Sequence, residues 1–332
     1  MISSVRVWVV NYKSANVLRE LLADLDTEAE VAGVVVLDNG SPEEDVRELL
    51  GLAQSFPKLT VERSEQNLGF GAGHNRIAAL TRARSGDGEA VWLLNPDMRV
   101  SPGTTAAMLE VLSGTPGAVV SPTITTRRGN RDRIWFSGGY VDCYAGRVED
   151  SQLGRDPAML SEVPDVVSTK FVSGAAPLMT RATWDHIGGF DETLFLYWED
   201  VEWSLRAVDR GHDLVVETKH PLFHHEGASS KGDVKARARA YYFMSRNRMW
   251  ICRSRGASVG RLLFGTGVPA LIRMAAFTVR RDGRGRLRRI ASILRGTLDG
   301  ARTPYVTMSA RGAVETHPPT AGNRPQEGDA AG

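Results

Sequence analysis

The sequence has few cysteines and no long apolar run, and each absence argues against a class of protein. Its 332 residues include only Cys143 and Cys252, which stand in no CxxC or other zinc-type spacing. No stretch reaches the roughly 18 uncharged apolar residues of a membrane span. The first residues have the profile of a strand rather than of a signal peptide. We therefore expect two reduced thiols in a cytoplasmic protein.

An excess of charge of one sign is also missing. The formal net charge is +2, so no global field selects a nucleic acid as partner. There is no Walker-type GK[ST] loop, and the glycines of residues 67–75 do not have the G-x-G-x-x-G spacing of a dinucleotide fingerprint. Another way for residues 67–75 to bind a nucleotide stays open. The backbone at Gly69 would approach the nucleotide closely, while Asn67 or Asn75 donates hydrogen bonds to it.

Strand-like and helix-like segments alternate along the first part of the chain. This alternation predicts an α/β fold with a mostly parallel central sheet flanked by helices. Ser14 and Ser41 are expected to cap the helices that follow them. The strand-like runs are residues 5–10, 34–37, 59–63, 90–94 and 118–121.

The rest of the chain shows different patterns from the first part, and these patterns suggest how the chain is divided into domains. Residues 122–170 are irregular and predict hairpins and loops, whereas residues 235–300 are largely helical in pattern. We expect a catalytic domain over residues 1–250, divided near residue 121 into a nucleotide-binding half and an acceptor-binding half. A basic helical extension over 251–310 and a disordered tail over 311–332 would complete the chain.

Three polar clusters fall at the expected carboxyl ends of strands. They contain Asn11, Asp38 and the run Asn95-Pro96-Asp97. Ligands of open parallel sheets bind beyond these strand ends, so the clusters are expected to converge on one crevice. Each cluster alone is equally typical of a capped turn.

Seven motifs in order resemble glycosyltransferase family 2, and are closest to its bacterial rhamnosyltransferase-like branch. The resemblance covers roughly residues 5–250 and implies a GT-A fold, in which one α/β domain binds a nucleotide-sugar. The motifs are NYKSANVLRELL, VVVLDNGS, NLGFGAGHN, LLNPD, VSGAAPLMTR, GGFDETLFLYWEDVEWSLR and FHHEGAS.

The resemblance implies a role for each of several polar residues. Asp38 matches the residue that hydrogen-bonds the nucleobase, and Asn95 replaces the first aspartate of the metal-binding Asp-x-Asp motif. Asp97 then carries the metal-binding carboxylate, and the further ligand falls on His224 or His225. We favour His224, because adjacent strand residues face opposite ways. Mg²⁺ or Mn²⁺ suits such a site, and an imidazole ligand favours Mn²⁺ modestly.

The Glu-Asp pair of the family falls on Glu199 and Asp200. The resemblance makes Asp200 the catalytic base, and Glu199 either orients it or binds acceptor hydroxyls. A carboxylate at a helix N-terminus is favoured by the helix dipole, which predicts an ionised Asp200. A plain helix-end carboxylate is the alternative interpretation.

Further positions have weaker assignments. Ser173 and Gly174 resemble a small-residue segment near the donor sugar, although a tight turn explains them as well. Trp198 is expected to stack on a sugar or to be an ordinary core aromatic. Arg246 is expected to contact the diphosphate or to be a surface charge on a helix.

Residues 257–300 combine apolar helical faces with clustered arginines. This pattern is typical of an element lying on a membrane surface, and equally of helices packed on the catalytic domain with a solvated arginine face. Arg273 within the apolar part argues against a membrane span. A lipid-linked acceptor would explain membrane contact at the inner face of the plasma membrane.

The resulting hypothesis is an inverting, metal-dependent glycosyltransferase that acts on a glycan or lipid-linked glycan. The resemblance makes dTDP-rhamnose the first expectation for the donor, while UDP- and GDP-sugars remain open. The alternatives are a sugar-phosphate nucleotidyltransferase and a non-catalytic nucleotide-sugar-binding protein. The first would need a Gly-rich, Arg/Lys-bearing loop where this sequence has NYKSANVL.

Overall fold

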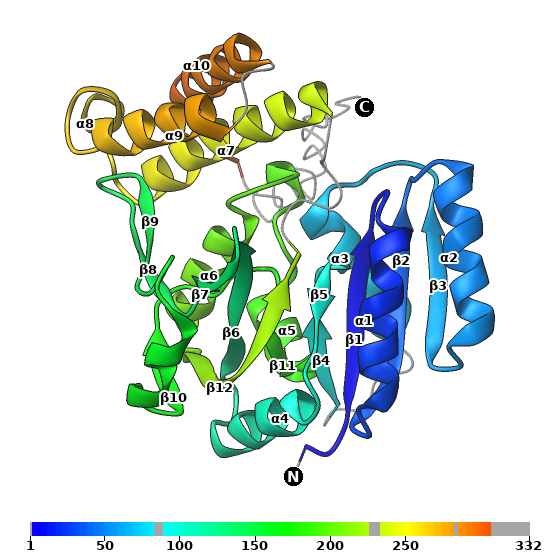
Figure 1. Cartoon of the computed structure of the whole chain (residues 1–332). Coiled ribbons are helices and arrows are strands. Elements are labelled where there is room, and N and C mark those ends of the chain that lie inside the picture. Colours follow the sequence, from blue (N-terminus) through cyan, green and yellow to red (C-terminus); the bar gives the residue numbers. More distant parts are fainter. Residues whose placement is uncertain (1, 83–88, 226–232, 282–284, 307–332) are drawn as a thin grey trace, which may run out of the picture.

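Parallel strands alternate with helices through the first third of the chain (Figure 1). The computed structural model describes residues 2–82, 89–225, 233–281 and 285–306. The strands lie in the order β3-β2-β1-β4 and are all parallel. The predicted α/β fold is therefore confirmed. The elements of this part are β1 (Val5–Asn11), α1 (Ala15–Thr27), β2 (Val31–Asn39), α2 (Glu43–Ser55), β3 (Leu59–Ser64), α3 (Phe70–Thr81) and β4 (Ala90–Leu93).

The second part extends the same sheet, with antiparallel strands added to it. Strand β11 lies antiparallel between β4 and β6, and β6 then pairs in parallel with β12. The irregular middle of the chain forms the predicted hairpins, β6–β7 and β8–β9. The strands are β5 (Met98–Arg99), β6 (Val119–Arg128), β7 (Arg131–Phe136), β8 (Gly139–Asp142), β9 (Arg147–Asp150), β10 (Val166–Thr169), β11 (Leu178–Thr180) and β12 (Leu214–His224). The helices are α4 (Thr104–Gly114), η2 (Pro157–Glu162), α5 (Arg181–Ile187), η3 (Glu192–Leu194) and α6 (Glu199–Asp209).

The sheet is buried on both faces by different helices. Successive strand residues point to opposite faces, so Val7 and Val9 of β1 pack with α1, α2 and α4. Trp8 packs on the other face with α3, α5 and α6. This two-sided burial explains why the parallel strands are continuous apolar runs.

The predicted side-chain caps of α1 and α2 are wrong. Ser14 stands at the N-cap of α1, but its hydroxyl donates to the Tyr12 carbonyl, and the Ala15 N–H is bound by Asp45 of α2. Pro42 rather than Ser41 stands at the N-cap of α2, and the Ser41 hydroxyl accepts from the Lys13 N–H. Asp45 therefore accepts a hydrogen bond at the start of α1 in place of the Ser14 side chain, and Ser41 binds the loop before α1 instead of capping α2.

In the described part of the chain, four helices follow β12, and they lie above the carboxyl end of the sheet in Figure 1. Helix α10 runs along α7 at close range: a side chain at Gly296 would collide with the Tyr242 carbonyl, and one at Gly300 would come within 2.6 Å of the Arg246 carbonyl. Among the described residues, no helix has both the length and the apolarity needed to cross a bilayer. The helices are α7 (Val234–Ser254), α8 (Val259–Phe264), α9 (Val268–Arg281) and α10 (Arg286–Arg302).

Candidate functional site

The ends of β1 and β2 bring two predicted substrate-binding residues side by side. Asn11 is directly opposite Asp38 in the parallel register, and both side chains are fully buried. Asn11 donates to the Asp45 carboxylate at 2.8 Å, and its own oxygen accepts no hydrogen bond from the described residues. Both Asp38 oxygens likewise lack a donor among those residues. A buried carboxylate without donors is costly, so this position suits a water molecule or a ligand that supplies N–H or O–H groups.

Asn39 fixes the Gly-rich segment that precedes α3. Its side chain accepts from the Leu68 N–H at 2.9 Å and donates to the Gly69 carbonyl at 3.0 Å. Asn67 accepts from the Gly69 N–H at 2.9 Å, and Gly69 has a φ of +92°. A side chain at Gly69 would collide with the Phe195 carbonyl. The sequence gave no signal that Asn39 would hold the Gly-rich segment in position.

Asn75 and Arg246 contact the protein itself, in contrast to their predicted contacts with substrate. The Asn75 amide donates to the Phe190 carbonyl and to Glu192, and it accepts from the Phe190 N–H at 2.8 Å. The Arg246 guanidinium donates to the Thr193 carbonyl at 3.0 Å and lies over the Trp250 ring. Both side chains brace the segment that leads to Glu199, and this segment competes with substrate for their hydrogen bonds.

Asp97 and His224 meet across two strands. The His224 Nε2 lies 3.1 Å from the Asp97 Oδ1, and both side chains are largely buried. The imidazole also packs edge-on against Trp135, which the sequence analysis did not identify. His225 faces away: its Nε2 lies 3.7 Å from Glu20, and only its backbone N–H bonds the Asp97 carbonyl. The two histidines thus face opposite sides of β12.

The donor set of Asp97 and His224 fits a divalent cation. Two neighbouring ligands of an octahedral cation of the size of Mg²⁺ or Mn²⁺ stand about 3 Å apart, and the observed separation is 3.1 Å. The described residues contain no cluster of three or more His, Cys, Asp and Glu side chains around a common point. A cation here would therefore need phosphate or water oxygens to complete its coordination.

Glu199 and Asp200 begin α6 as a pair of buried carboxyl groups. Asp200 accepts from the Gly174 N–H at 3.1 Å and from its neighbour Val201 at 2.9 Å. Burial nevertheless raises the pKa of Asp200 above its ordinary value. Burial, and then the Asp200 charge, raise the pKa of Glu199 further. The helix dipole is therefore not the dominant influence on Asp200, because desolvation outweighs the favourable backbone contacts and the net shift of its pKa is upward.

The small-residue segment around Gly174 joins these groups. The Asn95 N–H donates to the Ala175 carbonyl at 3.0 Å, and the adjacent Gly174 N–H binds Asp200. A side chain at Gly174 would come within 3.0 Å of the Phe70 ring and 3.3 Å of the Asp200 Cβ. Ser173 is buried and accepts from the Ala175 N–H at 3.3 Å. The β4 end, the start of α3 and the start of α6 therefore converge on one segment.

The backbone that enters α6 is strained and is held by Asn247, whose run Arg246-Asn247-Arg248 matches a family pattern but predicted a diphosphate contact rather than this role. Phe195, Tyr197 and Trp198 have φ angles of +62°, +64° and +71°. The fully buried Asn247 amide of α7 donates to the carbonyls of Leu194, Leu196 and Tyr197 at 2.8, 3.1 and 2.7 Å. Trp198 is itself buried among core residues, as its core-aromatic alternative predicts.

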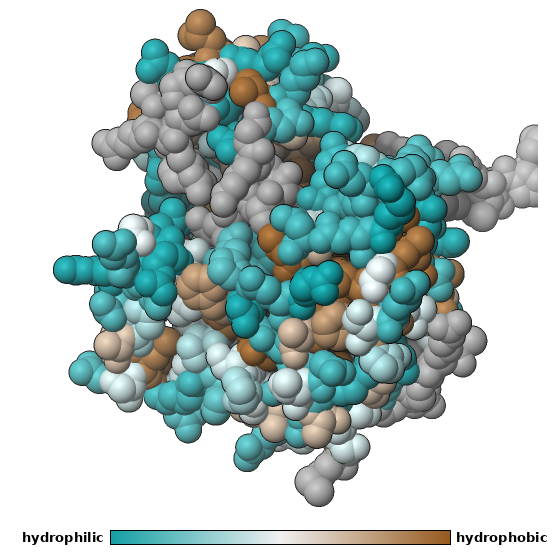
Figure 2. All heavy atoms as spheres, turned by 45° about the vertical axis from the view of Figure 1, so that its right-hand side comes forward, coloured by the Kyte–Doolittle hydropathy of each residue, from teal (hydrophilic) through white to brown (hydrophobic). Residues whose placement is uncertain are grey.

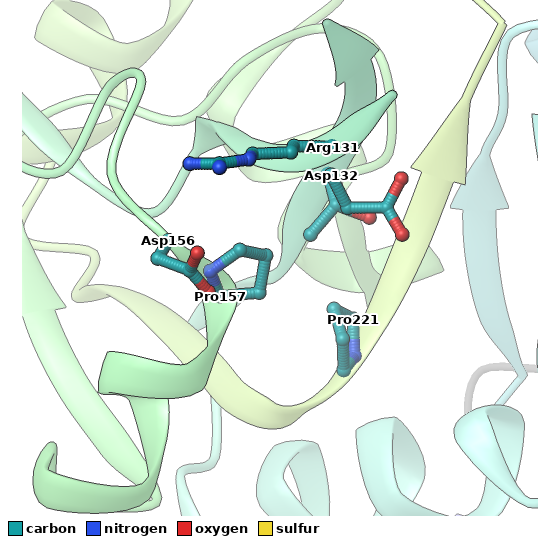
Figure 3. Close-up of a pocket in the computed structure, with 6 residues that line it drawn as sticks. Arg131, Asp132, Asp156, Pro157 and Pro221 are labelled. Carbon is teal, nitrogen blue, oxygen red and sulfur yellow. The ribbon is translucent and has the colours of Figure 1, made fainter. Parts of the chain in front are cut away.

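A separate cavity of about 590 Å³ lies beside the β6–β7 hairpin (Figure 3). Arg131 extends above Asp156 and Pro157 in this view, while the Asp132 carboxylate turns toward β12. None of the residues that the sequence singled out lines it. Its lining residues are Thr125, Arg131, Asp132, Asp156, Pro157 and Pro221.

The fold and the strand-end site define a glycosyltransferase with a GT-A fold. The chain belongs to glycosyl transferase family 2, whose family model matches residues 6–172. An N-acetylglucosaminyl-diphospho-decaprenol L-rhamnosyltransferase of Mycobacterium tuberculosis is 27% identical over 253 residues, which are 71% of this chain and 80% of that protein. The low-salt glycan biosynthesis hexosyltransferase Agl10 of Haloferax volcanii is 23% identical over 66% of this chain and 68% of its own length. Membership of this family favours an enzyme of sugar transfer over the two alternatives.

Solved structures share the fold at low sequence identity. A mannosyltransferase from Pyrobaculum calidifontis, in complex with GDP-Man and Mn²⁺, aligns with a TM-score of 0.56 at 15% identity over 91% of this chain and 88% of that one. GalNAc-T7 with UDP, GalNAc and Mn²⁺ aligns with a TM-score of 0.59 at 14% identity over 88% of this chain, which spans 54% of that longer chain. At these identities the likeness establishes the fold.

Asn247→Ala is expected to lower the transfer rate by about tenfold or more, because three carbonyls of the strained segment lose their donor. Thermal unfolding should show a loss of about 1–3 kcal/mol. The maximal rate should fall more than the apparent affinity for donor changes. Wild-type kinetics in a variant of reduced stability would disprove this positioning role.

Glu199→Gln is expected to stabilise the folded protein near neutral pH. The folded protein holds the Glu199 proton to a higher pH than the unfolded chain does, so this carboxyl favours folding below its ordinary pKa of 4.5. That advantage is lost as the pH rises through the raised pKa. Glutamine stays neutral, so the variant should melt above wild type at about pH 8 and close to it at about pH 4.

The matched control for this measurement is Glu202→Gln on the same helix. Glu202 forms a 2.8 Å ion pair with Arg206, so its loss should lower the melting temperature slightly at neutral pH. A Glu199→Gln protein that melts below wild type at about pH 8 would show that ionisation of the buried Glu199 carboxyl does not destabilise the folded protein.

Proposed function

We propose that the protein is an inverting, metal-dependent glycosyltransferase that moves a sugar from a nucleoside diphosphate donor to an acceptor hydroxyl. The observation that supports this most directly is the meeting of the β4 end, the α3 start and the Asp200 carboxylate at residues 173–176. Nucleotide, sugar and acceptor then share one edge of the sheet.

The nucleotide is bound at the ends of β1 and β2 in this proposal. The unpartnered Asp38 oxygens accept N–H groups of the nucleobase, and the Asn11 oxygen accepts a further donor. The Asn67–Gly69 backbone, fixed by Asn39, lies beside it. We take dTDP-rhamnose as the first donor to test, because a relative at 27% identity is an L-rhamnosyltransferase. UDP- and GDP-sugars are the alternatives.

Asp97 and His224 would hold the divalent cation, Mn²⁺ or Mg²⁺. When bound, the cation offsets the charge that develops on the departing diphosphate. Asp97 lies in the turn that the Asn95 N–H ties to Ala175. Its carboxylate and the His224 Nε2 are therefore positioned on a rigid frame before any ligand binds.

Asp200 is the proposed general base. Two backbone N–H groups fix its carboxylate, and the second lone pairs of its oxygens remain to accept the proton of the attacking hydroxyl. Burial brings its pKa closer to neutrality, which improves a carboxylate as a base. Glu199, whose pKa is raised by burial and by the Asp200 charge, orients the base or binds acceptor hydroxyls in this proposal.

A lipid-linked glycan is the proposed acceptor, which would place the enzyme at the inner face of the plasma membrane. The name of the Mycobacterium tuberculosis relative describes an acceptor of N-acetylglucosamine linked through a diphosphate to decaprenol. The match to that protein covers 71% of this chain and 80% of the relative.

Asp200→Asn is expected to reduce transfer by about 10² to 10⁴-fold, because the amide cannot take the proton of the acceptor hydroxyl. In the wild type, the rate should fall as the pH drops through the raised pKa of Asp200, so the acidic limb lies above the usual aspartate value of 3.8. Initial rates across pH measure both effects. Glu202→Gln should keep the wild-type profile, and an active Asp200→Asn enzyme would refute the assignment.

Asp97→Ala and His224→Ala are each expected to weaken Mn²⁺-dependent nucleotide binding by at least about tenfold. His225→Ala is the matched control and should bind as wild type does, because its ring faces Glu20. Calorimetry with dTDP, UDP and GDP, with and without Mn²⁺, measures this and identifies the base. Metal alone should bind weakly, since the protein offers two ligands. Loss of binding in His225→Ala with retention in His224→Ala would reverse the histidine assignment.

A further inference from the structure

Helix α10 has two apolar faces, and one of them lies in solvent. Ile293, Gly296 and Gly300 form the buried face, which packs along α7. Leu287, Leu294 and Leu298 lie on a different face and are 80%, 60% and 45% exposed. With the exposed Ala291, they follow the spacing i, i+4, i+7, i+11, which is one continuous stripe on a helix. A helix that needed only to pack on α7 would not carry this second stripe.

The neighbouring helices add further exposed apolar side chains. Phe264 at the end of α8 is 86% exposed, and Ile272 of α9 is 62% exposed. Figure 2 shows hydrophobic side chains standing among hydrophilic ones on the upper lobe, which the C-terminal helices form. We call these residues and the leucine stripe of α10 the apolar face of the lobe. Single exposed apolar side chains are ordinary on protein surfaces, so the continuous stripe of α10 is the feature that marks an interaction surface.

Arginines accompany the apolar face. Arg286, Arg288 and Arg295 of α10 are exposed next to the leucine stripe, and Arg261 and Arg273 are exposed on α8 and α9. The sequence of residues 257–300 contains Asp282 and Asp299 as its acidic residues. Asp299 already accepts from the Tyr242 hydroxyl and faces Arg295. The apolar face is therefore set in a positively charged surround.

We infer that the apolar face of α8, α9 and α10 docks on an anionic lipid bilayer, with the leucines inserted among the acyl chains and the arginines on the headgroups. This combination of an apolar stripe with flanking cations is that of helices lying in a membrane interface. A second copy of this chain fits less well, because a symmetric contact would bring arginine against arginine. The inference names the surface on which the proposed lipid-linked acceptor is met, and to that extent rests on the proposed function.

The position of the lobe gives the docking a consequence for catalysis. The lobe lies above the carboxyl end of the sheet, where the site residues converge (Figure 1). Helix α7, on which α10 packs, carries the Asn247 amide that holds the segment before Asp200. A bilayer bound to the lobe would thus lie on the side of the molecule at which the parallel strands end, which is the side where the proposed lipid-linked acceptor is needed.

Vesicle co-sedimentation of the full chain tests the inference. The protein should pellet with vesicles of phosphatidylglycerol and phosphatidylcholine, much less with phosphatidylcholine alone, and less again as salt is raised. Leu294→Gln/Leu298→Gln should weaken binding by at least about tenfold. The matched control is Leu50→Gln/Leu153→Gln, because those leucines are 44% and 59% exposed on other parts of the surface and should not matter.

Three outcomes would overturn the docking surface. They are no binding of wild type to phosphatidylglycerol vesicles at low salt, equal binding by the α10 variant, and a wild-type dimer that the α10 variant converts to a monomer in sedimentation velocity. Donor-sugar hydrolysis, measured on the same proteins, should be unchanged by the α10 substitutions. A protein that binds vesicles but hydrolyses no donor would contradict the proposed function and leave the docking surface in place.

Discussion

The burial of the Asp200 carboxylate is the constraint on which the site depends. Two backbone N–H groups hold it, one from Gly174 and one from the helix that it begins. Helix α6 begins at this point only because three non-glycine residues between Phe195 and Trp198 adopt positive φ angles. Each of these costs about 1–3 kcal/mol. The Asn247 amide offsets this strain through three carbonyls. The Asp200 carboxylate and the distant Asn247 amide are therefore held in place by the same short segment.

The two halves of the sheet contribute different parts of the site. The parallel half ends in Asp38 and in the turn that holds Asp97, as strand ends of this kind do in nucleotide-binding folds. The second half supplies His224 from β12 and Asp200 from α6. Helix α7 holds the segment before Asp200 through Asn247 and also packs against α10. One helix therefore joins the candidate site to the surface that would meet the acceptor.

Local sequence was sufficient for most of the fold. Continuous apolar, β-branched runs predicted the parallel strands, because both faces of each such strand are covered by helices. Turn-forming residues then identified the strand ends, and with them Asp38 and Asp97. The helix that begins at Glu199 was also predicted, within one residue of its start. These features depend on neighbours within a few positions, which a single sequence displays.

The sequence by itself thus determined the order of strands and helices and the residues at the strand ends, since these follow from periodicity and turn chemistry. Only the tertiary structure decided which histidine faces Asp97 and that burial outweighs the helix dipole at Asp200. It also decided that Asn75 serves the protein's own backbone and that Asn247 supports the catalytic segment. The contacts of His224, Asn75 and Asn247 join residues 127, 115 and 53 positions apart, which packing brings together and local pattern does not encode.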